Sequence, residues 1–323
     1  PRAARRSESA HPMTRNPTAA GVALAVTSVV SFGAMAIFAR LSYSDGVTPV
    51  SLLFIRFAMA ALIMLMIARI RGEHFPRGRV LLGFALMGGV GYVGQSLSFF
   101  TALTMADAGL VALLLYLYPA IVVVLSAIFL RERLTLYRIA AVVLSLVGTA
   151  LTVGPQLEAR PLGVVLGISA AVIYSVYIMA GTTLVREQPP IASSAVIMSA
   201  AAVVFGVLAL ADGLALPDGW LGWFGIVGVA IVATVVAVTT FLMGIKLIGP
   251  TRASVLSTIE PVVTVVLAAI VLGESIGPMT AVGGALILAG AMMLAGARRP
   301  RVPRVVATQP DEPSQGHDAS PIE

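Results

Sequence analysis

The sequence predicts an all-α polytopic membrane protein with ten transmembrane helices, arranged as two inverted five-helix repeats. Three observations predict it. Of 323 residues, 58% are hydrophobic and only 11% are charged, with a mean hydropathy of +0.97, whereas soluble domains are about half apolar and a quarter charged. Ten apolar stretches follow one another, each close to the ~20 residues that a helix needs to cross a bilayer. The first five stretches also match the last five at one fixed spacing.

The spans divide the chain into four parts. Residues 1–18 and 298–323 are polar, and we expect both to form disordered cytoplasmic tails. Between them lie a first five-helix repeat, 19–154, and a second, 162–297. The ten expected spans are 19–41, 49–70, 79–103, 106–129, 136–154, 162–184, 191–211, 220–245, 251–273 and 277–297.

The repeat is clearest in the fourth and ninth spans. Pro119 and Pro261 are 142 positions apart, and so are Glu132 and Glu274 (261 minus 119 and 274 minus 132 each give 142). Because five crossings are an odd number, the second copy must lie upside down relative to the first. Eighteen of the 21 basic residues fall on the side that holds both termini and two on the other. By the positive-inside rule, both termini are therefore expected to be cytoplasmic.

Three short motifs accompany this architecture. They are Pro49-x6-Arg56-Phe57 in span 2, Pro119...Leu130-x-Glu132 in span 4 and Glu260-Pro261...Leu272-Gly273-Glu274 in span 9. With ten spans in two halves, they resemble the EamA-like family of the drug/metabolite transporter superfamily over residues 19–297. The resemblance implies a secondary transporter of a small metabolite, amino acid or drug-like solute in the cytoplasmic membrane, often an exporter. Inverted repeats are a recurring architecture of such carriers.

Glu260 is the only carboxylate well inside a predicted span. A charge at that depth costs a few kcal/mol or more, so it normally faces a cavity or a partner. Ser254, Ser257 and Thr264 lie at helical spacing from it and form one polar stripe with it, which indicates a wet cavity for a cation, an amine or a proton. The structural alternative is a neutral glutamic acid bonded to a neighbouring helix, near the carbonyl that Pro261 leaves free.

Tyrosines mark three further spans. Tyr118 occupies, in the first repeat, the position that the intramembrane glutamate has in the second. Tyr92 and Gln95 share one face of span 3, and Tyr174 and Tyr177 share one face of span 6. Phenol and amide groups together suit an amphipathic metabolite, a cation or an aromatic amino acid. Interfacial belts and helix packing also use tyrosine, so both interpretations stay open.

Arg56 lies about 10 Å below the outer end of span 2, at 1.5 Å per residue. It could bind a substrate carboxylate or pair with Glu260, or it could serve structure by extending to the interface or holding backbone carbonyls. Pro119 and Pro261 each remove a backbone hydrogen bond and bend their helices. They are candidate gating hinges, with a static kink as the alternative.

Other conspicuous residues are expected to serve the fold. Glu132 and Glu274 end their helices in short turns, where turn or capping contacts are expected. Glycines recur in the third and tenth spans, where they let helix backbones approach closely. These glycines are Gly83, Gly88, Gly89, Gly91, Gly277, Gly283, Gly284, Gly290 and Gly296.

The composition also excludes several kinds of site. The chain has no cysteine, and His11, His74 and His317 lie outside the spans, so we expect no metal and no cofactor. No serine has a basic partner at membrane depth and no aspartates pair there, so we expect no enzyme. Energy would come from an ion gradient, because no nucleotide-binding motif exists.

The expected partners are a small-molecule substrate and the lipid bilayer, and no nucleic acid despite the formal charge of +6. Proton coupling and a homodimer are left open. A channel, or a receptor or scaffold that transports nothing, remains an alternative.

Overall fold

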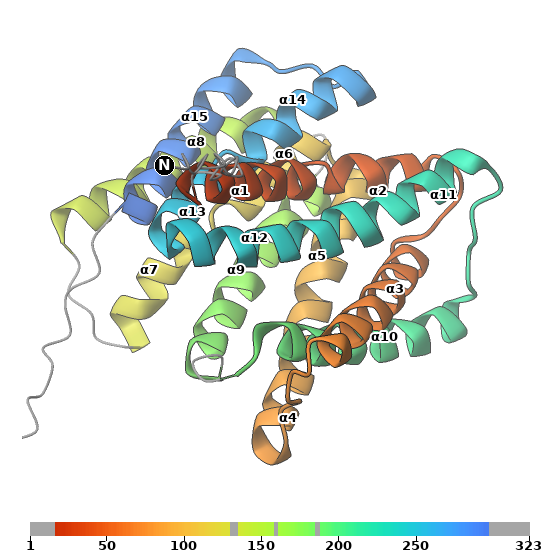
Figure 1. The fold of residues 1–323 in the computed structure, drawn as a ribbon. Coiled ribbons are helices and arrows are strands. Elements are labelled where there is room, and N and C mark those ends of the chain that lie inside the picture. Colours follow the sequence, from red (N-terminus) through yellow and green to blue (C-terminus); the bar gives the residue numbers. More distant parts are fainter. Residues whose placement is uncertain (1–16, 130–134, 158–160, 185–187, 297–323) are drawn as a thin grey trace, which may run out of the picture.

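The computed structural model describes residues 17–129, 135–157, 161–184 and 188–296, and this part of the chain contains helices and no strands (Figure 1). The helices are α1 (Pro17–Gly33), α2 (Met35–Tyr43), α3 (Pro49–Ile70), α4 (Gly78–Leu86), the π-helix η1 (Met87–Tyr92), α5 (Val93–Met105), α6 (Ala108–Leu115), α7 (Tyr118–Phe129), α8 (Leu136–Leu157), α9 (Pro161–Leu184), α10 (Pro190–Asp212), α11 (Trp220–Val227), the π-helix η2 (Gly228–Val236), α12 (Ala237–Ile248), α13 (Pro250–Ser257), α14 (Glu260–Leu272) and α15 (Pro278–Gly296).

Within the described residues, eight helical stretches are long and apolar enough to cross a membrane. The two remaining predicted spans, 136–154 and 251–273, correspond to the shorter apolar helices Leu136–Thr152 and Glu260–Leu272. The eight long stretches are Thr18–Tyr43, Pro49–Ile70, Gly78–Met105, Ala108–Phe129, Pro161–Gly181, Pro190–Asp212, Trp220–Ile248 and Pro278–Ala295. Large apolar side chains on the outer surface are exposed, as expected where a protein contacts lipid. The chain is therefore a multi-pass membrane protein.

The two matched prolines lie at equivalent breaks in the fourth and ninth spans. Pro119 is the second residue of α7 and Pro261 the second residue of α14, and two non-helical residues precede each helix. Proline lacks the N–H that would bond the carbonyl four residues earlier, which frees the carbonyls of Leu115 and Ser257. The sequence predicted a bend at each proline, and the structure divides each span into two half-helices.

Two π-helical segments also occupy equivalent positions, which the sequence did not predict. Met87 and Tyr92, the ends of η1, fall on Val229 and Thr234 of η2 at the spacing of 142 (229 minus 87 and 234 minus 92). The Thr234 hydroxyl donates to the Val229 carbonyl at 2.8 Å. Since π-helical turns are local departures from α-helix, often found at functional sites, hydrophobic periodicity gives no signal for them.

The packing of the helices follows the duplication. The fifth span packs against the tenth (α8 on α15) and the second against the seventh (α3 on α10), so each of these pairs joins equivalent helices (Figure 1). The first span packs against the eighth (α1 on α12) and the third against the sixth (α5 on α9). Because the first span is equivalent to the sixth and the eighth to the third, these last two pairs are the same contact seen from each repeat. The two repeats are therefore related in space as well as in sequence.

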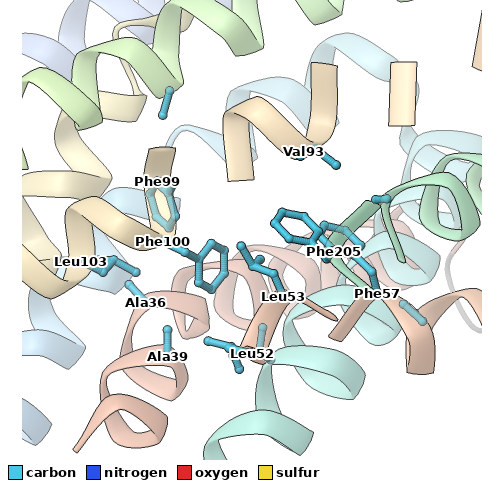
Figure 2. Packing of buried hydrophobic residues seen from close by; sticks show 14 of the residues in the cluster. Ala36, Ala39, Leu52, Leu53, Phe57, Val93, Phe99, Phe100, Leu103 and Phe205 are labelled. Carbon is cyan, nitrogen blue, oxygen red and sulfur yellow. The ribbon is translucent and has the colours of Figure 1, made fainter. Parts of the chain in front are cut away.

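The largest group of buried side chains joins α2, α3, α5 and α10 (Figure 2). Phe57 of α3 and Phe205 of α10 stack with ring centroids 5.6 Å apart, and both are fully buried. Ala36 and Ala39 of α2 and Phe100 of α5 lie in the same cluster. Because lipid is as apolar as these side chains, close packing rather than escape from water holds such helices together.

Loop carboxylates cap the starts of neighbouring helices. The Glu274 carboxylate accepts hydrogen bonds from the backbone N–H of Ala108 at 2.8 Å and of Gly109 at 3.2 Å, at the start of α6. Asp45 and Glu73 accept backbone N–H bonds at the starts of α11 and α10 in the same way. The capping role predicted for Glu274 is confirmed, and its counterpart Glu132 lies outside the described residues.

Replacing Glu274 with alanine should destabilise the protein by about 1–2 kcal/mol, because two buried donors at the positive end of α6 lose their acceptor. Thermal unfolding in detergent would measure the change. Asp212→Ala removes an exposed carboxylate at the end of α10 and is the matched control. Equal melting temperatures for the two variants would contradict the capping role.

Candidate functional site

Glu260 lies at the break between α13 and α14 and bonds a tyrosine from the other repeat. The Tyr116 hydroxyl lies 3.0 Å from Oε2 of Glu260 and 2.6 Å from the carbonyl oxygen of Ser257. That carbonyl is the one that Pro261 leaves without a helical donor. This contact matches the structural alternative for Glu260, in which the side chain bonds a neighbouring helix near the carbonyl that Pro261 leaves free. Tyr116 is the hydrogen-bond partner that the structure records for the Glu260 carboxyl.

Five tyrosines form a continuous series of ring contacts, here called the tyrosine row. Its first member, Tyr116, is the one that bonds Glu260. The ring centroids are 5.8 Å apart from Tyr116 to Tyr118 and 5.0 Å from Tyr118 to Tyr174. They are 6.1 Å apart from Tyr174 to Tyr177 and 5.7 Å from Tyr177 to Tyr92. The row crosses from α7 through α9 to the end of η1. It therefore joins three spans of both repeats.

The accessibility of this group differs from that of a packed core. Tyr116 is buried, whereas Glu260 and the other four tyrosines of the row are partly accessible. Four tyrosines and the Glu260 side chain are thus partly accessible near the middle of their spans. Aromatic faces and a carboxylate are the groups that recognise amines and aromatic rings.

Thr264 and Ser257 of the predicted polar stripe lie near Glu260, but their hydroxyls bond backbone carbonyls. The Thr264 hydroxyl bonds the Gly33 carbonyl of α1 at 2.9 Å and the Glu260 carbonyl at 3.3 Å. Ser257 takes part through its carbonyl, while its hydroxyl bonds the Ala253 carbonyl within α13. The side chain of Ser254 lies outside the described residues.

Of the other predicted residues, Tyr118, Tyr92, Tyr174 and Tyr177 come together in the row. Gln95 is buried one turn beyond Tyr92 and accepts a hydrogen bond from the neighbouring Ser96 hydroxyl at 3.3 Å. It makes no contact with the row that the described geometry records.

Tyr116 is the residue that sequence reasoning missed. The alignment of the two repeats favours Tyr118 as the site residue, because it occupies the position equivalent to Glu260. The hydroxyl that reaches Glu260, however, belongs to Tyr116. The two broken spans pack against each other through α6 and α14, which brings their proline breaks together. Once the fold shows that the matched breaks meet, any polar side chain at one break is a candidate partner for Glu260.

Arg56 is buried, with 2% of its surface exposed, so it does not extend to the interface. Its Nε donates to the Thr234 hydroxyl at 2.9 Å, and its guanidinium lies 5.0 Å from the centroid of Phe57 and 5.1 Å from that of Phe100. The structure records no ion pair between Arg56 and Glu260 among the described residues. The predicted pairing of these two side chains is absent there.

Pro119 and Pro261 are the second residues of the second half-helices, and because they lack an N–H the first half-helices end before them, at Leu115 and Ser257. Gly33 of α1 packs directly on this region, because a Cβ there would lie 2.8 Å from Val263 and 3.1 Å from the Glu260 carbonyl. The breaks are thus held by contacts, and both a hinge and a static kink are compatible with them.

A separate groove of about 450 Å³ lies between α3 and α10, and only apolar residues line it.

Comparisons with known proteins agree with this architecture. The model of the EamA-like transporter family matches residues 19–154 and 161–296. Two proteins of Archaeoglobus fulgidus described as uncharacterized transporters are each 27% identical over 277 and 283 residues, covering 83% of this chain and 94% and 95% of theirs. A solved protein crystal structure has the same fold, with a TM-score of 0.60 at 22% identity over 85% of this chain and 96% of that one. The chain belongs to the EamA-like transporter family and is a multi-pass membrane transporter.

Proposed function

We propose that the protein is a secondary carrier that exports a small amphipathic solute in exchange for protons, with Glu260 as the group that couples the two. The observation that carries the proposal is the carboxyl of Glu260, which lies at a helix break in a partly accessible side chain and bonds Tyr116 of the other repeat. A carboxyl there can hold either a proton or an ammonium group. Competition between the two is the simplest form of exchange.

The architecture supports alternating access. Two repeats with matched proline breaks that pack against each other supply the same parts twice, and inversion of the second copy would open them to opposite sides. Five crossings in each repeat and the distribution of basic residues favour this inversion, with both termini in the cytoplasm and the protein in the cytoplasmic membrane. Export is the direction in which similar carriers often work. We propose no enzymatic activity.

Counterflow in proteoliposomes tests the carrier against a channel. Vesicles are loaded with one of three unlabelled solutes that each carry one aromatic ring. L-phenylalanine has a positive and a negative charge, phenethylamine has only the positive charge, and 3-phenylpropionate has only the negative charge. We expect the labelled form of at least one of them to accumulate transiently and to saturate with concentration. Equilibration without overshoot, at a rate proportional to concentration, would indicate a channel.

A further inference from the structure

Arg56 is a buried cation without a carboxylate partner in the described part of the chain. A guanidinium at membrane depth costs several kcal/mol unless an anion or other groups compensate it. The carboxylates around the bundle are occupied elsewhere: Asp45, Glu73 and Glu274 bond helix starts, and Glu260 bonds a tyrosine. Among the described residues, a hydroxyl and two aromatic rings contact the guanidinium of Arg56, and no carboxylate neutralises its charge.

The protein fixes the orientation of the guanidinium. The Thr234 hydroxyl donates its own hydrogen to the Val229 carbonyl at 2.8 Å, so its oxygen is held as an acceptor for Nε of Arg56. The rings of Phe57 and Phe100 lie against the guanidinium at 5.0 and 5.1 Å. Of its five N–H donors, those on the two terminal nitrogens form the fork that binds an oxyanion with two parallel hydrogen bonds.

The guanidinium is also continuous with the tyrosine row. The ring of Phe57 contacts the ring of Tyr92, the last member of the row, with centroids 5.3 Å apart. A single series of aromatic rings thus runs from a carboxylate, Glu260, to a cation, Arg56.

We propose that Arg56 is an anion-binding group of the solute site, and that the carrier takes solutes with a carboxylate, or another singly charged oxyanion, next to an aromatic or apolar body. The ammonium group that competes with the proton at Glu260 belongs to the same solute. The fork of Arg56 binds the oxyanion, the rings bind the body, and Thr234 positions the fork. This inference deepens the proposed function by assigning a substrate class, but equilibrium binding tests it without any transport.

The probe is 3-phenylpropionate, which has one ring and one carboxylate, and the comparison is its neutral analogue 3-phenylpropanamide. Binding to the purified full chain in detergent would be measured by thermal shift over a concentration series. We expect wild type to prefer the carboxylate by at least about tenfold, and Arg56→Gln to lose that preference. Arg56→Lys keeps the charge without the fork and should retain a reduced preference. Asp212→Asn, at an exposed site, should behave as wild type.

Thr234→Val and Thr234→Ser separate positioning from structure. We expect the valine variant, which lacks the acceptor for Nε, to lose most of the preference for the carboxylate over the amide, and the serine variant to keep it. A purely structural role would weaken both probes equally. If Arg56→Gln does not fold, the lysine and valine variants decide the question.

The anion could also be a lipid phosphate, and reconstitution in phosphatidylglycerol or phosphatidylcholine nanodiscs distinguishes the two sources. Stabilisation by phosphatidylglycerol that depends on Arg56, without a response to 3-phenylpropionate, would assign the oxyanion to a lipid headgroup and overturn the solute class proposed here. Equal binding of carboxylate and amide in wild type, with no Arg56-dependent lipid effect, would overturn the proposal. So would an unchanged preference in Arg56→Gln and Arg56→Lys.

Discussion

Glutamine in place of Glu260 is expected to abolish proton-driven solute transport while leaving the protein folded. Glutamine has nearly the same shape and its side-chain oxygen can still accept the hydrogen bond from Tyr116, so the break between α13 and α14 keeps its contacts. It cannot release or take up a proton. The measurement is solute flux in proteoliposomes with and without a pH gradient, where wild type should exceed the variant by at least about tenfold.

The control for this experiment is Asp212→Asn, which removes an exposed carboxylate at the end of α10. It should show the full response to the pH gradient. A normal pH-dependent flux in Glu260→Gln would remove Glu260 from the coupling mechanism, and the contact with Tyr116 would then be a structural bond between the two broken spans.

A large loss of stability is expected from Gly283→Ala, at the contact between α8 and α15. A Cβ at Gly283 would lie 2.5 Å from the Gly148 carbonyl oxygen and would also collide with the Thr152 hydroxyl. Both groups belong to a packed helix, so backbone must move. Overpacking of this kind costs about 1–3 kcal/mol or more, and thermal unfolding should detect it.

Gly89→Ala is the matched control, because its Cβ would meet only Val204 at an ordinary distance of 3.6 Å. A second close contact between the same two helices predicts a similar loss for Gly290→Ala. A Cβ at Gly290, also in α15, would lie 2.6 Å from the Ala141 carbonyl oxygen of α8. Gly148 and Gly290 are 142 positions apart (290 minus 148), and each meets the carbonyl of the opposite helix at 2.6 Å. If Gly283→Ala melted at the temperature of Gly89→Ala, the close contact of α8 and α15 would be wrong.

The sequence was sufficient for features that depend on composition and spacing. The apolar stretches, the matched prolines and the glycines of the tenth span have direct physical meanings, namely crossing a bilayer, breaking a helix and close packing. The capping by Glu274 followed from its place at a helix end, although the helix that it caps could not be identified. That helix, α6, starts 166 residues away from it.

The rest depends on which helices meet, and that is a property of tertiary packing. Tyr116 could not be assigned to Glu260 by alignment, because the two halves touch each other rather than lying in register. Likewise, nothing local marks η1 and η2 as π-helical, and the burial of Arg56 depends on Phe57, Phe100 and Thr234 converging on it from three elements. Side chains with several possible partners need the fold before their role can be argued.

The central claim is that Glu260 exchanges a proton for solute, and proton release on binding tests it most directly. The solute identified by counterflow would be added to purified protein in weakly buffered solution with a pH indicator. We expect about one proton to be released per solute bound in wild type, because linkage makes proton and solute binding mutually exclusive at one carboxyl, and none in Glu260→Gln. Solute binding without proton release in wild type, or equal release in both proteins, would contradict the account.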